Sequence, residues 1–341
     1  MLGFASLLAS ATRQIEASFI RKAVSVEYQR NDSVRATDVS IDGPSGILAV
    51  NGRLIVAEFF GGRLLEIDAT TNTMRPVLDK AAGCANELLL QHPTNIGLLK
   101  RDEYVVLESL SAQINRIALK GCLSQPILST RMTEFGLKIE PPLALAVAQD
   151  GSIYFTDWGH RLLRLSNRTL TVVLDKSAGL RFPQGLALDR EGNILIADTE
   201  NHRVCRVRRD DAKFETIAGS GVAGSGGDGE QAIRAQLRFP SALTVGSTGE
   251  IFVGGSGRVR MIHASDGRIS TVAGTGTLIH AGDNEAATRA SFMSVAALAV
   301  DGRQLYITDM DANRVRSVDL RSGKITTVAG NGLPVRRKGH A

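Results

Sequence analysis

Long apolar runs are missing from this 341-residue sequence, and none approaches the roughly 18 residues that predict a membrane-spanning helix. Prolines number only 9 while 43% of the residues are hydrophobic, which excludes collagen-like, low-complexity and globally disordered classes. Aromatic residues are scarce, at 5% with a single tryptophan, so the stacking platforms that single-stranded RNA needs are few. The net charge of +5 is small, and its one dense basic cluster, at residues 336–340, predicts a solvated tail. We therefore expect no membrane span, and nucleic acid is a disfavoured partner.

Cysteine is rare and shows no metal-site pattern: Cys84, Cys122 and Cys205 form no CxxC pair. Because repeats that bury a continuous core need no disulfides, we predict that all three are free thiols, and free thiols favour a reducing, cytoplasmic compartment. The first 23 residues differ from the rest, and we expect a helical lead-in there, with a secretory or a mitochondrial signal as alternatives. The alternation in Val24–Tyr28 predicts one strand outside the main domain. Together these segments give a short N-terminal helix and strand extension over residues 1–40.

Glycine is abundant, at 35 residues, and most of the chain is one unit repeated six times. Each copy runs from a small or proline-containing start through an apolar strand, a glycine turn and a second strand ending in an acid. A third strand bearing arginine and a fourth strand complete it. The clearest copy covers residues 182–219, and the six copies begin near residues 43, 92, 141, 182, 239 and 292.

The repeated unit predicts the fold. A four-stranded sheet that is apolar on both faces cannot bury them alone, whereas six such sheets packed around an axis can. We therefore predict an all-β fold, a six-bladed β-propeller of four-stranded antiparallel blades, over residues 41–335, followed by a basic tail over 336–341. The last repeat carries all four of its own strands, so no N-terminal strand is needed to complete the ring.

Two linkers, at residues 219–238 and 274–291, also repeat each other. In each, an aspartate (Asp228 or Asp283) precedes a short alanine-containing run with one arginine. We predict that this carboxylate caps the N–H groups of a single helical turn, which contributes about 1 kcal/mol. A phosphate-binding loop is the alternative for the glycine-rich sequence, although it lacks the lysine of a P-loop.

The repeat resembles the NHL repeat, and the resemblance covers about residues 41–332. The segments that carry it are Phe182–Gly185, Ile196–Thr199, Asn201–Val204 and Thr327–Gly330. It implies a six-bladed propeller, and because such propellers include binding platforms and enzymes, it specifies the fold better than the function. The fifth copy departs from the pattern at Gly254-Gly255, where the acid is missing, and the first three copies are degenerate.

The start of each first strand and each second-to-third strand loop are expected on one face, where related propellers bind ligands. Of the acids there, we take Glu58, Glu108 and Asp157 as candidate general acids or bases, and Asp198 and Asp309 as structural turn-formers. Divergence from the repeat on this side of the ring is what a specific site would produce. The candidate ligand-binding residues are Phe59, Phe60, His92, Asn95, Trp158, His160, Gln184, His202 and Asp311.

The sequence does not carry the metal-binding residues of related propellers. Peptide-amidating-type lyases use histidines at several blade starts, and here only His92 occupies such a start. Gluconolactonase-like propellers bind a divalent ion through positions that match Asp42, Gln184 and Ser241, of which one is charged. We therefore expect no metal and no cofactor.

We predict a monomeric propeller that binds a small molecule, a protein or a peptide on this face. The first alternative is a metal-independent enzyme of small molecules (a lyase, a cyclase or a strictosidine-synthase-like condensing enzyme). RNA binding is the second alternative. The arginines of the third strands, including Arg203, Arg260 and Arg316, are expected in ion pairs between blades or in solvent.

Overall fold

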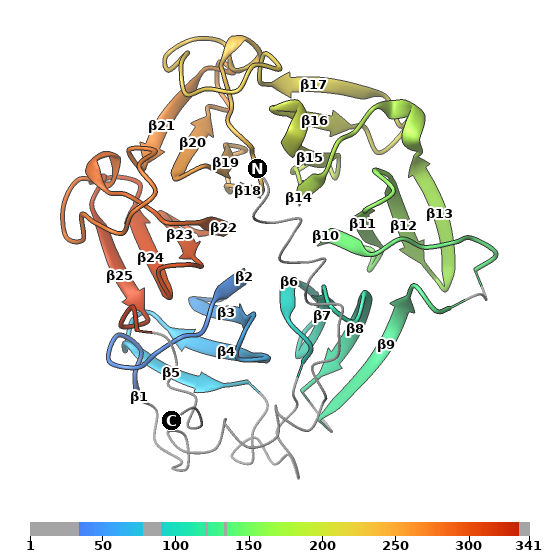
Figure 1. The fold of residues 1–341 in the computed structure, drawn as a ribbon, viewed down its shortest axis with the longest axis horizontal. Coiled ribbons are helices and arrows are strands. Elements are labelled where there is room, and N and C mark those ends of the chain that lie inside the picture. Colours follow the sequence, from blue (N-terminus) through green and yellow to red (C-terminus); the bar gives the residue numbers. More distant parts are fainter. Residues whose placement is uncertain (1–33, 78–89, 120–121, 133–134, 334–341) are drawn as a thin grey trace, which may run out of the picture. The chain divides into compact units, whose positions relative to one another are not determined.

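The computed structural model describes residues 34–77, 90–119, 122–132 and 135–333, and it is a ring of six antiparallel sheets (Figure 1). Blade one consists of β2 (Pro44–Val50), β3 (Arg53–Glu58), β4 (Arg63–Asp68) and β5 (Thr73–Pro76). Blade two consists of β6 (Pro93–Lys100), β7 (Glu103–Glu108), β8 (Gln113–Ala118) and β9 (Leu123–Ser129). Blade three consists of β10 (Pro142–Val147), β11 (Ile153–Asp157), β12 (Leu162–Ser166) and β13 (Thr169–Leu174).

The other three blades have the same order of strands from the axis outward. Blade four consists of β14 (Pro183–Leu188), β15 (Ile194–Asp198), β16 (Arg203–Val207) and β17 (Phe214–Ala218). Blade five consists of β18 (Ala242–Val245), β19 (Ile251–Gly255), β20 (Arg258–Ile262) and β21 (Ile269–Ala273). Blade six consists of β22 (Val295–Asp301), β23 (Gln304–Asp309), β24 (Arg314–Asp319) and β25 (Ile325–Ala329). Short 3₁₀ turns lie between strands: η2 (Lys176–Ala178), η3 (Thr199–Asn201), η4 (Ala232–Arg234) and η5 (Ala287–Arg289). The predicted all-β six-bladed propeller is confirmed.

The apolar core lies between neighbouring blades, because each sheet has an apolar residue on both faces of its second strand. All five residues of β11 and all five of β15 are buried. One cluster joins Tyr154 and Leu162 of blade three to Leu186 and Ile196 of blade four. Packing of this kind makes each blade depend on its neighbours, as expected for repeats that bury a continuous core only when stacked.

The N-terminal part of the described chain adds an outer strand to blade one. β1 (Val34–Arg35) pairs with β5, and all four strands of blade six come from the end of the chain. The prediction that no N-terminal strand completes the ring is therefore confirmed. The two ends are nevertheless tied, because the N–H of Gly330 donates to the carbonyl of Ala36 (2.8 Å). The predicted helix over 1–23 and the strand over Val24–Tyr28 lie outside the described residues.

The capping role predicted for the linker aspartates is wrong. The residues at the N-caps of η4 and η5 are Gln231 and Ala286, and neither accepts a side-chain cap hydrogen bond. Asp228 instead forms an ion pair with Arg260, and Asp283 pairs with Arg316. The physical reason is burial: Arg260 and Arg316 are 4% and 0% exposed, so each needs a carboxylate far more than a one-turn 3₁₀ segment needs a cap.

The prediction of three free thiols is wrong for Cys122, which is disulfide-bonded. Cys205 is a buried free cysteine, and burial raises the pKa of its thiol to about 12, so it stays protonated. Cys84 lies outside the described residues. The argument from free thiols to a reducing compartment therefore loses its premise.

Candidate functional site

One end of the ring carries the six turns between second and third strands together with the starts of the first strands; we call it the channel face. Backbone hydrogen bonds hold the two sets together, as from the N–H of Trp158 to the carbonyl of Pro141 (3.0 Å) and from Met310 to Ser294 (3.0 Å). Each turn ends in a residue with positive φ, which reverses the chain tightly into the third strand. These six residues are Gly62, Ala112, His160, His202, Gly257 and Asn313.

Three of those turn residues connect one blade to the next. The Nδ1 atom of His160 accepts a hydrogen bond from the N–H of Phe182 (3.1 Å), and Nδ1 of His202 accepts one from Phe239 (3.4 Å). Asn313 connects blade six to blade one in the same way, because its Oδ1 atom accepts a hydrogen bond from the N–H of Gly43 (3.0 Å). The two histidines predicted to bind ligand thus have a structural role between blades; their contact with a ligand stays a prediction.

In blades one and four, the acid at the end of the second strand crosslinks its own blade. Asp198 is fully buried and accepts hydrogen bonds from the N–H of Arg181 (2.7 Å) and from Nε of Arg203 (2.8 Å). Glu58 is also fully buried; it accepts from the N–H of Asp42 (2.6 Å) and forms an ion pair with Arg63. Both carboxylates join the start of the first strand to the third strand of the same blade.

The other two predicted acid–base residues are equally enclosed. Glu108 is 3% exposed and accepts from the N–H of Gln91 (2.9 Å), from the hydroxyl of Ser111 (3.2 Å) and from the amide of Asn115. Asp157 is 0% exposed and pairs with Arg161 (2.5 Å). Proton transfer to a substrate would require any of these groups to leave its partners, so the acid–base role of Glu58, Glu108 and Asp157 stays a prediction.

Aromatic side chains predicted as ligand contacts gather in two places on the channel face. The ring of Phe59 lies 4.8 Å from that of His92 and 4.9 Å from that of Phe60. Trp158 packs edge-on against Phe182, with ring centroids 5.2 Å apart. Both places present an exposed ring, since Phe60 and Trp158 are among the exposed large hydrophobic residues.

Three further predicted residues stand apart from these groups. Asn95 is half-buried in β6, Gln184 is exposed in β14, and Asp311 is exposed in the turn before β24. None of the three makes a side-chain hydrogen bond within the described part of the chain. Their polar groups therefore remain available to a ligand, and their role stays a prediction.

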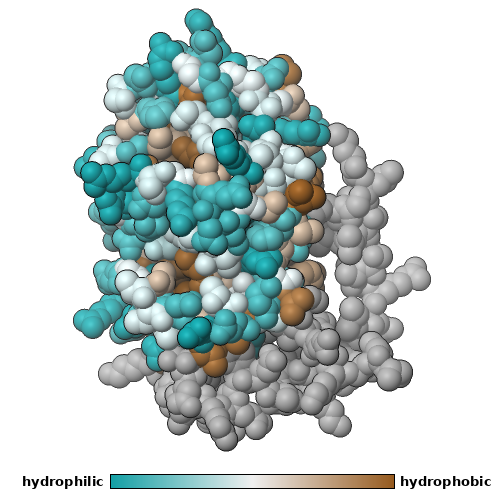
Figure 2. Space-filling model, turned by 90° about the vertical axis from the view of Figure 1, so that its left-hand side faces the viewer, coloured by the Kyte–Doolittle hydropathy of each residue, from teal (hydrophilic) through white to brown (hydrophobic). Residues whose placement is uncertain are grey.

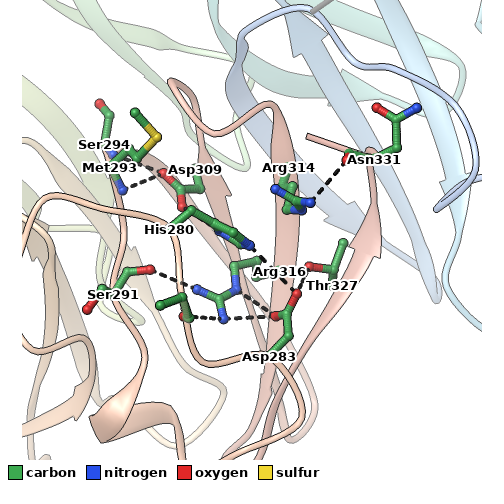
Figure 3. A network of polar contacts seen from close by, with 11 residues as sticks. His280, Asp283, Ser291, Met293, Ser294, Asp309, Arg314, Arg316, Thr327 and Asn331 are labelled. Carbon is green, nitrogen blue, oxygen red and sulfur yellow. Dashed lines mark hydrogen bonds and ion pairs between the residues drawn. The ribbon is translucent and has the colours of Figure 1, made fainter. Parts of the chain in front are cut away.

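Sequence reasoning missed a polar network in blade six (Figure 3). Asp309 accepts hydrogen bonds from the N–H groups of Met293 and Ser294 through Oδ1, both at 2.9 Å. Its Oδ2 is buried without a hydrogen-bond partner among the described residues, and so is Nδ1 of His280. The two atoms lie 3.6 Å apart, and the imidazole lies between the carboxylates of Asp309 and Asp283. Arg314, which pairs with Asp309 in the strand register, donates instead to the carbonyl of Asn331 (3.0 Å).

This environment favours the uncharged form of both Asp309 and His280. Burial raises the pKa of Asp309 from 3.8 to about 6. Burial also lowers the pKa of His280 below its ordinary value, and the positive charges of Arg314 and Arg316 lower it further. A carboxyl and an imidazole with pKa values brought together by burial are a physical sign of a functional site.

A signal for this pair was present in the sequence. When the linkers 219–238 and 274–291 are aligned on Asp228 and Asp283, His280 stands where the other linker has Ser225. A titratable ring that replaces a small residue in a repeated element is a departure that can be found by alignment alone. Its position opposite Asp309 could not be found that way, since it depends on how the linker folds back.

Metal ligands do not cluster in the part of the chain that the structure describes: no three His, Cys, Asp or Glu side chains come together as a cation site would require. None of the described helices has the length and hydrophobicity needed to cross a membrane.

Comparison with known proteins agrees with this architecture. Residues 133–281 match the teneurin NHL domain family. The matched residues span blades three to five, and with the six antiparallel blades the match supports an NHL-repeat propeller. Teneurin-m of Drosophila melanogaster is 29% identical to this NHL propeller over 147 residues, 39% of the chain and 5% of teneurin-m. The protein SUPPRESSOR OF QUENCHING 1, chloroplastic, of Arabidopsis thaliana is 27% identical over 161 residues, 46% of the chain and 15% of that protein. The NHL propeller thus spans a small part of either relative.

Solved structures share the fold at low identity. A chain of the nidogen/laminin complex superposes with a TM-score of 0.56 and 18% identity, covering 77% of this chain and 88% of its own. A gluconolactonase from Xanthomonas campestris gives 0.57 and 18%, covering 80% and 85%. A virginiamycin B lyase from Staphylococcus aureus gives 0.53 and 14%, covering 90% and 89%. The fold therefore occurs in a binding complex and in enzymes.

Proposed function

We propose that this NHL propeller is a binding module that takes a protein or peptide partner on its channel face. The observation that carries the proposal is the exposure of large apolar side chains from four different blades on that face. Phe60 and Leu110 are each 49% exposed, and Trp158 and Met293 are each 40% exposed. Exposed apolar groups of this size mark interaction surfaces when they gather on one face.

The spacing of these side chains favours a macromolecular partner over a small one. They stand on separate blades around the ring, and the cavity at the blade-five part of the face has a volume of about 150 Å³. Drug-sized ligands occupy pockets of roughly 300–1,000 Å³. The flank of the propeller over blades five and six is mostly hydrophilic, with apolar atoms only in small spots (Figure 2). Exposed aromatic and other large apolar side chains that a small ligand could not contact together suit a protein or peptide partner.

The Trp158→Ala substitution is expected to reduce partner capture by about tenfold or more, because a central exposed tryptophan contributes disproportionately to an interface. The melting temperature should change by only a few degrees. The matched control is Val172→Ala, which alters a side chain that is also 40% exposed but lies in β13, away from the channel face. Quantitative pull-down with the full chain, followed by direct binding to the partner identified, checks this. Equal loss in both variants would contradict the proposal.

A second candidate, metal-independent acid–base catalysis, is favoured by the His280–Asp309 pair. An imidazole lies 3.6 Å from a carboxylate oxygen, the pKa of the carboxyl is raised to about 6 and that of the imidazole is lowered from its ordinary value, so two groups that can exchange a proton stand side by side. A gluconolactonase and a virginiamycin B lyase solved with quinupristin have similar folds, so gluconolactone and quinupristin are the first compounds to test as substrates. RNA binding gains no supporting observation from the described residues.

If that candidate is correct, gluconolactone or quinupristin should be turned over, and His280→Gln should lower kcat/KM by about a hundredfold. His263→Gln is the control, because His263 contacts Ser270 in another blade (2.9 Å) and is remote from this pair. Absence of turnover with either compound, or full activity in His280→Gln, would reject the enzymatic candidate and leave the binding proposal unaffected.

A further inference from the structure

The linkers before blades five and six fold in the same way, which allows the two blades to be compared residue by residue. Nη1 of Arg260 donates to the carbonyl of Gln236 (2.8 Å), and Nη1 of Arg316 donates to the carbonyl of Ser291 (3.0 Å). Each arginine also pairs with the linker aspartate of its own blade. Equivalent residues of the two linkers therefore occupy equivalent places over the channel face.

The two blades differ in what fills one such place. In blade six it contains the side chains of Asp309 and His280. In blade five the corresponding residues are Gly255, at the end of β19, and Ser225, in the linker. Both of these smaller residues line the cavity of about 150 Å³. A cavity of this volume accommodates roughly six non-hydrogen atoms, the size of benzene.

The cavity is positively charged, because blade five has kept the arginine but not the acid. Arg258 faces Gly255 in the strand register, as Arg203 faces Asp198 in blade four. Arg203 pairs with its acid, whereas Arg258 has no carboxylate partner among the described residues and donates only to the carbonyl of Thr275 (2.6 Å). Arg258 and the exposed Arg238 both line the cavity.

The chain itself has no room to supply the missing acid from Gly255. A Cβ atom there would lie 2.5 Å from the carbonyl oxygen of Phe239 and 3.0 Å from that of Arg238. Any carboxylate that reaches Arg258 at this place must therefore come from another residue or from another molecule. Arg258 is half-buried and lacks a counter-charge, so an anion that enters the cavity gains a charge-assisted hydrogen bond to its guanidinium.

We propose that this cavity in blade five is a subsite for the carboxylate group of a ligand, with Arg258 as its main counter-charge. The ligand carboxylate takes the place that an acidic side chain occupies in the other blades. The proposal deepens the proposed binding function by naming a chemical group that the channel face recognises. It rests on that function only in placing the subsite on the face where the partner binds. A free organic acid and an acidic side chain of a protein partner share this chemistry.

The test titrates the full chain with lactate and with lactamide, its neutral analogue of the same size, at constant ionic strength set with sodium chloride. We expect lactate to raise the melting temperature at about 100 mM and lactamide to leave it unchanged. Arg258→Gln should weaken lactate binding by about tenfold or more. Arg314→Gln is the matched control, because Arg314 donates to the carbonyl of Asn331 (3.0 Å), which lies two residues after the fourth strand of blade six as Thr275 does in blade five. It should bind lactate as the unsubstituted chain does.

A second variant keeps the test valid if Arg258→Gln is unstable. Ser225→His introduces the residue that blade six has at this place, fills the cavity and should abolish lactate binding while the protein stays folded. Equal shifts with lactate and lactamide, or unchanged lactate binding in both Arg258→Gln and Ser225→His, would overturn the proposal.

The source of the carboxylate is distinguished with N-acetyl-aspartate amide and N-acetyl-asparagine amide. Tighter binding of the aspartate compound than of lactate supports a side chain from a partner, and the reverse supports a free organic acid. If no carboxylate binds but Trp158→Ala still abolishes partner capture, only the subsite proposal fails. If lactate binds and Trp158→Ala has no effect on capture, the subsite stands without the protein-binding face.

Discussion

The Asp309→Asn substitution is expected to raise the free energy of unfolding at about pH 8 by up to 3 kcal/mol and to leave it nearly unchanged at about pH 4. The pKa of Asp309 is about 6 in the folded protein against an ordinary 3.8, because the carboxyl is buried. Between these values the folded state holds a proton that the unfolded state has released. Stability therefore falls as the pH rises from about 4 to about 6, and above that range the folded protein carries an unfavourable buried charge.

Asparagine removes this penalty without removing the useful contacts. Its carbonyl oxygen can accept from the N–H groups of Met293 and Ser294 as Oδ1 of Asp309 does. At about pH 8 the imidazole of His280, whose pKa is lowered, is neutral in the folded and the unfolded state of both proteins, so it does not contribute to the difference there. Urea unfolding of the two proteins at the two pH values measures the effect.

The same change at Asp198 is the control, because it occupies the equivalent position in blade four. Asp198 accepts from Asn201 (2.8 Å) and pairs with Arg203, so its charge is compensated. Asp198→Asn should therefore lower stability at about pH 8, by about 2 kcal/mol. If both substitutions destabilise at that pH, Asp309 is not the uncompensated group that its surroundings indicate. A carboxylate kept at this cost is better explained by a function than by turn formation alone.

The fold was predictable from the sequence because the repeat is present in every blade. The predicted starts at residues 43, 92, 141 and 182 each precede the observed first strands by one residue, since these begin at Pro44, Pro93, Pro142 and Pro183. Each second strand is apolar on both faces and most end in an acid that pairs locally, so short-range patterns determine the elements. Packing between identical units then determines the ring.

The polar interior was less predictable because it depends on where the linkers fold back. The arginines of the third strands were expected in ion pairs between blades or in solvent. Arg260 and Arg316 do form ion pairs, but with the linker aspartates of their own blades. Their burial beneath the linkers was missed, and so were the true partners of Asp228 and Asp283. The residues around an arginine on a strand do not indicate which segment of the chain will cover it. The repetition of the whole linker, including its aspartate, did indicate that the linkers have this role.

The Arg316→Met substitution is expected to lower the free energy of unfolding by about 3–5 kcal/mol, the largest loss of any single change considered for this protein. Arg316 is fully buried and binds Asp283 through Nε (3.0 Å) and Nη2 (2.8 Å). It also donates to the carbonyls of Ser291 (3.0 Å) and Ala281 (3.1 Å), and its guanidinium lies 5.0 Å from the ring of Phe292. Methionine has similar length but leaves the carboxylate and both carbonyls without this donor.

Blade five provides the comparison that separates burial from ion pairing. Arg260 binds an equivalent aspartate and two equivalent carbonyls, with Leu237 where blade six has Phe292, and the side chain of Asp228 is 44% exposed, against 29% for Asp283. Water can solvate the freed aspartate in blade five more easily, so Arg260→Met should cost less than Arg316→Met. Replacing Asp283 with Asn together with Arg316→Met should recover part of the loss, because the uncompensated charge is then absent. Urea unfolding of the three variants measures this, and equal losses in blades five and six would show that the carbonyl contacts, not the buried charge, determine the stability of the linkers.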